Sequence, residues 1–77
     1  MTMTLAEFHN ALRILRSIDR AEIWDEKIEF DDDPRPGHAM REEHAWNRFR
    51  DNPYETFIRC SDKVAAGLWR IIARRQA

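Results

Sequence analysis

Apolar residues recur three and four positions apart near both ends of this 77-residue chain, which strongly favours a fold of packed helices. The N-terminal stripe consists of Leu5, Phe8, Leu12, Leu15 and Ile18. The C-terminal stripe consists of Val64, Leu68, Ile71 and Ile72. Thr4 and Glu7 have the spacing of a capping box, so a helix should start there. We predict helices over residues 5–17 and 62–75.

The middle of the chain carries shorter helical signals. Ser17 or Asp19 is placed to cap a second helix, and Glu22 lies three residues beyond Asp19. This pattern predicts a short helix over 19–25. A further helix is predicted over 38–50, because apolar and charged residues there separate onto two faces. Ser61 or Asp62 should cap the C-terminal helix.

Two short segments are ambiguous. Residues 27–30 alternate polar and apolar side chains, as a strand does, but no partner strand is evident. They form either a strand or an extended segment that holds Ile28 and Phe30 against the helices. Pro53 suits the first turn of a helix over 54–59. The aromatic and β-branched residues of that segment also leave a strand open, and we favour the helix.

The predicted fold class is all-α: a single domain over residues 1–77, built as a bundle of three to five helices around one core. Three aspartates, two prolines and a glycine make residues 31–37 an acidic, proline-containing loop. The predicted core consists of Leu5, Phe8, Leu12, Leu15, Ile18, Trp24, Trp46, Phe49, Phe57, Ile58, Val64, Leu68, Ile71 and Ile72.

Cysteine content and hydropathy indicate the compartment. Cys60 is the only cysteine, so no disulfide can form within the chain, and a reducing, cytoplasmic setting is expected. The first residues lack a basic and then apolar export signal. Charged residues interrupt every apolar run well before the roughly 18 residues that a membrane span requires. We therefore expect no membrane partner.

Metal-binding patterns are weak in this sequence. His38 and Glu42 are four residues apart on one predicted helix, but nothing nominates a third ligand. Glu43-His44 lacks the histidine that a zinc-hydrolase motif places three residues before the glutamate, since Met40 occupies that position. The acidic loop lacks the alternating ligands and terminal glutamate of a calcium loop. We expect neither a metal nor another cofactor.

Catalytic patterns are also incomplete. Cys60 has no histidine near it in sequence to act as a base, so we interpret it as a small buried thiol. The two glycines, Gly37 and Gly67, do not form a phosphate-binding loop. We predict that the protein is not an enzyme. Gly67 costs its helix about 1 kcal/mol relative to alanine, which indicates that another backbone, most simply from the same chain, packs closely there.

Charge is distributed unevenly along the chain. Residues 1–38 contain nine acidic and five basic residues, whereas residues 39–77 contain five acidic and eight basic ones. The simplest interpretation is that folding brings the two halves together and neutralises most of this asymmetry. The alternative is a small nucleic-acid-binding accessory factor. Its candidate contacts are Arg59, Lys63, Arg70, Arg74 and Arg75. A net charge of −1 makes nucleic acid an unlikely partner.

Large aromatic side chains are numerous, with three tryptophans, four phenylalanines and one tyrosine. A bundle of this size cannot enclose all of them, and exposed aromatic residues commonly anchor protein interfaces. The candidate interface residues are Trp24, Trp46, Tyr54 and Trp69. We therefore expect a protein-interaction or self-associating module that binds another protein or forms a homo-oligomer. The rings might otherwise only shield the edge of the core.

The C-terminal third resembles small uncharacterised proteins of bacterial prophages. The resemblance lies in Asp51–Arg59, Ser61-Asp62, Leu68–Ile72 and Arg75-Gln76. It implies a prophage or accessory setting, in which small proteins act by binding as structural adaptors or as inhibitors of host machinery. It assigns no function to any residue.

Overall fold

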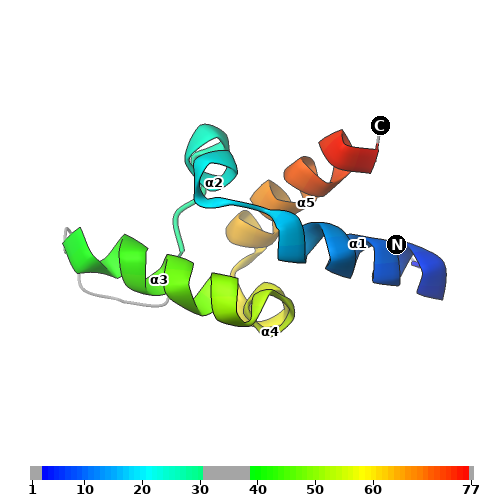
Figure 1. Ribbon diagram of the computed structural model, residues 1–77, viewed down its shortest axis with the longest axis horizontal. Helices are drawn as coiled ribbons and strands as arrows, with labels where there is room; N and C mark the ends of the chain where they lie inside the picture. Colours follow the sequence, from blue (N-terminus) through cyan, green and yellow to red (C-terminus); the bar gives the residue numbers. More distant parts are fainter. Residues whose placement is uncertain (1–2, 31–38, 77) are drawn as a thin grey trace.

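The computed structural model describes residues 3–30 and 39–76, with only the backbone described for residues 39–43. It is all-helical over these residues, as predicted, and contains no strand there (Figure 1). The helices are α1 (Leu5–Ser17), α2 (Arg20–Glu26), α3 (Ala39–Asp51), α4 (Pro53–Arg59) and α5 (Asp62–Gln76).

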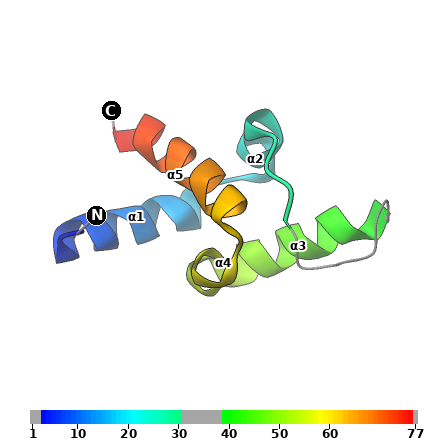
Figure 2. The same ribbon diagram turned by 180° about the vertical axis from the view of Figure 1, so that it is seen from behind.

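The helices pack as a small bundle in which α1 and α5 lie against each other and α4 contacts both of them. α3 packs on α4, which follows it in sequence, and α2 packs on α5. Figures 1 and 2 show the first turn of α1 near one end of the molecule and the beginning of α3 at the other. The central part of the bundle is therefore covered on more sides than either end.

Side-chain caps fix the starts of α1 and α2 where the sequence predicts them. The Thr4 hydroxyl accepts a hydrogen bond from the Glu7 amide at 3.1 Å. The Asp19 carboxylate accepts one from the Glu22 amide at 3.0 Å, and the Glu22 carboxylate accepts one from the Asp19 amide at 3.5 Å. Each bond satisfies an amide that the helix itself leaves unpaired. Asp19, rather than Ser17, is the cap of α2.

The ambiguous segment after Asn52 is a helix, not a strand. Pro53 occupies its first turn, and the Asn52 side-chain oxygen accepts a hydrogen bond from the Glu55 amide at 3.3 Å. Proline loses nothing at that position because its missing amide would have no partner within the helix. At the start of α5, the Ser61 hydroxyl accepts a hydrogen bond from the Val64 amide at 3.4 Å.

Residues 27–30 form the extended segment rather than a strand. Lys27 ends α2 in the left-handed region with φ of 59°, and its amide donates to the Trp24 carbonyl at 3.0 Å. The chain then turns away from the axis of α2. Phe30 is buried and Ile28 is half-buried against the core, so the segment fixes α2 by two side chains.

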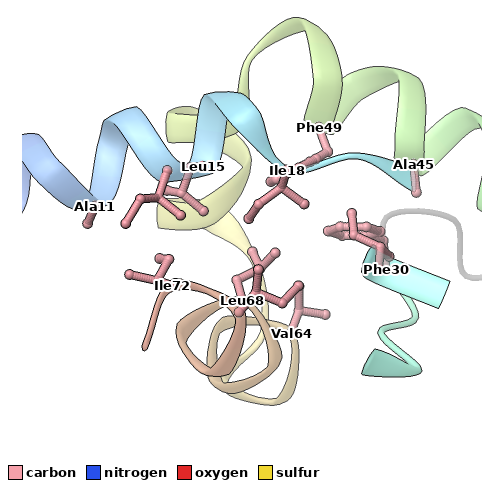
Figure 3. Packing of buried hydrophobic residues seen from close by; sticks show 12 residues of the cluster. Ala11, Leu15, Ile18, Phe30, Ala45, Phe49, Val64, Leu68 and Ile72 are labelled. Carbon is pink, nitrogen blue, oxygen red and sulfur yellow. The ribbon is translucent and has the colours of Figure 1, made fainter. Parts of the chain in front are cut away.

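One hydrophobic core joins all five helices and the extended segment (Figure 3). Its buried residues are Ala11, Ile14, Leu15, Ile18, Ile23, Phe30, Ala45, Phe49, Val64, Leu68, Ile71 and Ile72. Seven of the predicted core residues are among these. Leu12, Trp46 and Phe57 were also predicted, and they are half-buried against this core.

Three predicted core residues are wrong. The exposed fractions are 73% for Leu5, 60% for Ile58 and 51% for Trp24. Phe8, also predicted to lie in the core, is only half-buried. The helices that carry these residues present other side chains inward, and the buried residues of α1 all lie in its second half. Periodicity identifies an apolar stripe but not how much of it neighbouring helices cover. The prediction also omitted buried residues, namely Ala11, Ile14, Ile23, Phe30 and Ala45.

Gly67 is buried against the same chain, as expected, but its neighbour is a side chain and not a backbone. A Cβ atom at Gly67 would lie 2.6 Å from Cγ1 and 2.9 Å from Cδ1 of Ile28. These distances are shorter than ordinary carbon contacts of about 3.5–4.0 Å. The missing side chain at Gly67 therefore makes room for the extended segment.

Candidate functional site

The four aromatic residues predicted to form an interface do not gather in one place. Tyr54 and Trp24 are exposed, whereas Trp46 and Trp69 are half-buried against the core. Trp69 packs edge-on against Phe57 at 5.3 Å between ring centroids, which makes it part of the α4–α5 contact. The aromatic residues therefore divide between the core edge and two separate exposed regions.

The first exposed region surrounds Trp24 on α2. The Arg20 guanidinium lies 5.7 Å from the Trp24 ring centroid, within the range of a cation–π contact. Trp24 and Trp46 line a cavity of about 20 Å³ together with Arg20, Ile23, Ile28 and Phe30. That volume is close to the space of one water molecule, so the cavity is too small for an organic ligand.

The second exposed region is larger in apolar content and is here called the α1–α4 patch: Leu5 and Phe8 of α1 with Tyr54 and Ile58 of α4. The Phe8 and Tyr54 rings meet edge-to-face at 5.5 Å and join the two helices. Leu5 lies one turn before Phe8, and Ile58 one turn after Tyr54, so each pair is adjacent on its helix. The four side chains thus form one continuous apolar surface.

This patch exists because the apolar stripe of α1 continues past the core. Leu12 and Leu15 contact the core, but no residue of α1 before Ala11 is buried. Leu5 is consequently 73% exposed, and across the patch Ile58 is 60% exposed. Sequence reasoning placed Leu5, Phe8 and Ile58 in the core and so missed them as surface residues. The available signal was an apolar stripe running to the first turn of α1.

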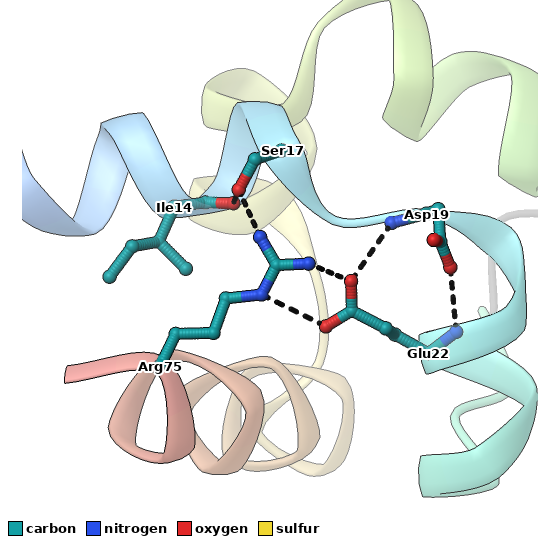
Figure 4. A network of polar contacts seen from close by, with 5 residues as sticks. All are labelled: Ile14, Ser17, Asp19, Glu22 and Arg75. Carbon is teal, nitrogen blue, oxygen red and sulfur yellow. Dashed lines mark hydrogen bonds and ion pairs between the residues drawn. The ribbon is translucent and has the colours of Figure 1, made fainter. Parts of the chain in front are cut away.

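The basic residues of α5 hold the acidic residues of α2. Nε of Arg70 and Nη1 of Arg74 both donate to the Glu26 carboxylate, the latter at 2.5 Å. Arg75 binds Glu22 through two nitrogens and also donates to the Ser17 hydroxyl (Figure 4). These contacts confirm that folding brings oppositely charged segments of the chain together. Three of the five candidate nucleic-acid contacts therefore have acidic partners within the fold.

The other two candidate contacts lie apart from this network. Arg59 pairs with Glu55 one turn earlier on α4, at 3.2 Å. Lys63 is exposed in the first turn of α5. Both ions of the Arg59–Glu55 pair keep half or more of their side-chain exposure, so the pair contributes little to stability.

Glu26 makes the stability of the α2–α5 contact dependent on pH. Hydrogen bonds from Arg70 and Arg74 lower the pKa of Glu26 below its ordinary value of 4.5. A carboxyl group with a lowered folded-state pKa stabilises the protein above its unfolded pKa, and this contribution is lost as the pH falls through the folded value. The contribution is therefore fully present at pH 7 and disappears below pH 4.5.

We expect Glu26→Gln to lower the midpoint of thermal unfolding at pH 7, because both arginines lose their ionic partner. The difference from the unmodified protein should shrink as the pH is lowered below 4.5, and also as salt is raised. Circular dichroism melts between pH 7 and pH 3 measure both trends. Asp25→Asn, at the exposed neighbouring position, is the matched control. A difference that stays constant with pH would contradict the role of the Glu26 charge.

A polar pocket of about 380 Å³ opens between α3, α4 and Phe30. Acidic and basic side chains both line it, including Asp51, Glu55 and Arg59, and Cys60 lies at its wall. The Cys60 thiol donates to the Phe57 carbonyl at 2.9 Å. Burial, with a smaller effect of the Asp62 carboxylate, raises the pKa of Cys60. A raised pKa keeps the sulfur protonated and makes it a poor nucleophile at neutral pH.

The candidate metal ligands of the sequence largely escape description. His38 and the aspartates at 31–33 lie outside the described residues, as does the Glu42 side chain. Among the side chains that are described, no three of His, Cys, Asp or Glu are grouped so as to hold a metal ion.

No protein family, curated protein or solved structure matches this chain. Over its described residues, no helix is both long and apolar enough to cross a membrane.

Proposed function

We propose that this protein is a non-catalytic protein-interaction module that binds through the α1–α4 patch. The observation that carries the proposal is the continuity of this patch: the Phe8–Tyr54 contact joins two exposed residues, Leu5 and Ile58, into one apolar surface. Contiguous exposed apolar surface on a small protein marks an interaction site more often than do single exposed residues.

The patch contains enough apolar surface to support specific binding. Complete burial of a leucine or isoleucine side chain contributes about 1.5–3 kcal/mol. Leu5 and Ile58 are both largely exposed, so a partner that covers them gains most of this amount at each position. Phe8 and Tyr54 add aromatic surface that is already held in place by their mutual contact. Preordered side chains lose less entropy on binding.

The setting of this function is part of the proposal. A single cysteine suits a reducing, cytoplasmic compartment. The resemblance of the C-terminal third to small prophage proteins suggests an accessory role in a bacterial prophage. Such a role requires neither a cofactor nor a reaction, and its partner would be another protein or a second copy of this one.

Affinity capture from cells of the native source tests the proposal with single variants of the patch. We expect Leu5→Glu and Ile58→Lys each to reduce retention of specific partners at least about tenfold, the equivalent of 1.4 kcal/mol. Both substitutions suit their helix ends, since Leu5 lies in a first turn and Ile58 near a last turn.

Ala66→Glu and Ala73→Lys on the exposed face of α5 are the matched controls and should retain partners as the unmodified protein does. Circular dichroism establishes that every variant is folded. Equal retention by patch and control variants would refute the proposal. So would the absence of any retained partner together with a strictly monomeric protein.

A further inference from the structure

We infer that the partner of the α1–α4 patch is a second copy of this chain, with the first two turns of α1 packed antiparallel across a two-fold axis. The inference rests on the proposed function and names the occupant of the same surface. In this arrangement Leu5 of each copy meets Leu12 of the other, and the axis passes between Phe8 and His9. The interface is isologous, so both copies use the same residues.

The spacing of the α1 stripe fits a helix as the partner. Leu5, Phe8, Leu12 and Leu15 are separated by three, four and three residues, which is the a/d pattern of paired helices. The core covers the later part of this stripe and leaves the earlier part exposed. The free seam is therefore limited to residues 5–12, about two helical turns.

The charge distribution fits a second copy. The exposed seam consists of Leu5, Phe8 and Leu12 with His9 beside them, and contains no aspartate, glutamate, lysine or arginine. Two copies of a charged seam would repel each other, whereas two copies of this one do not. A strongly charged partner would find no opposite charge here. On α4, Tyr54 and Ile58 extend the same uncharged surface, while Glu55 pairs with Arg59.

The helix dipole favours the antiparallel direction. A parallel pair would place both α1 N-termini, each with a partial positive charge, next to each other, whereas the antiparallel pair separates them. The seam is short, so the interface falls below the roughly 1,200 Å² of standard stable complexes. The dimer should accordingly be weak and in rapid exchange with the monomer.

Sedimentation velocity from about 10 µM to about 1 mM protein measures the association, since weak contacts of this size dissociate at lower concentration. We expect the mean mass of the unmodified protein to rise from the monomer value of 9.3 kDa toward twice that value. Leu5→Glu should weaken dimerisation at least about tenfold, because two carboxylates then enter an apolar seam. Ala66→Glu on α5 is the control and should dimerise normally. A monomer at every concentration, or equal dimerisation by Leu5→Glu, would overturn the inference.

Disulfide trapping tests the direction of the helices. In a Cys60→Ser background, His9→Cys lies beside the axis and should form a disulfide between copies. Leu5→Cys should not, because the axis separates the two Leu5 positions by about 10 Å along the helices at 1.5 Å per residue. A disulfide requires Cα atoms within about 7 Å. Faster trapping at Leu5→Cys than at His9→Cys would contradict the antiparallel arrangement.

Failure of self-association and failure of the proposed function give different results. A monomeric protein that still retains another protein through Leu5 and Ile58 refutes the second copy and supports the interaction module. A monomeric protein without any patch-dependent partner refutes both.

Discussion

Phe49→Ala should unfold most of the protein at 25 °C. Phe49 is 1% exposed, and its ring lies 5.5 Å from that of Phe30 and 5.9 Å from that of Trp46. Truncation of a buried phenylalanine to alanine costs about 3–5 kcal/mol. A core in a domain of this size rarely supplies more than about 3–5 kcal/mol in total. Urea unfolding followed by circular dichroism compares the variant with the unmodified protein.

Two companion variants distinguish the core from other aromatic contacts. Phe49→Leu retains most of the buried volume and should cost the fold much less than Phe49→Ala. Phe8→Ala removes a ring that is only half-buried, and its variant should remain folded with a cooperative transition. If Phe49→Ala unfolds with the same midpoint as the unmodified protein, Phe49 does not hold the centre of the core.

Gly67→Ala should destabilise the protein even though alanine is the better helix former. Its Cβ would lie 2.6 Å from Cγ1 of Ile28, and overpacking of this kind costs about 1–3 kcal/mol. The gain in helix propensity is about 1 kcal/mol and only partly offsets that cost. The expected net loss of up to about 2 kcal/mol can be measured by chemical denaturation.

The sign of this effect should reverse in an Ile28→Ala background. Without the Ile28 side chain, the alanine at position 67 meets no close neighbour, and Gly67→Ala should then stabilise the protein by about 1 kcal/mol. A double-mutant cycle isolates the coupling between the two positions. Gly67→Ala that stabilises the protein equally in both backgrounds would contradict the close approach of Ile28.

The sequence alone predicted the all-α class and the approximate bounds of the described helices. Those signals are local: a cap such as Thr4 or Asp19 satisfies amides within its own first turn, and Pro53 restricts only its own neighbourhood. The extended segment was harder to predict, because a strand and an extended segment have the same alternation. Whether Ile28 and Phe30 meet a strand or a helix bundle depends on residues far away in sequence.

Only the tertiary structure decided which parts of the apolar stripes are buried. Leu5 and Leu15 belong to one stripe, yet α5 and α4 leave the first exposed and the core encloses the second. The pairing of Glu26 with Arg70 and Arg74, which joins positions more than forty residues apart, was likewise set by packing. Periodicity fixes the face of a helix, but the extent of that face that is covered depends on where the other helices end. The α1–α4 patch is that uncovered remainder.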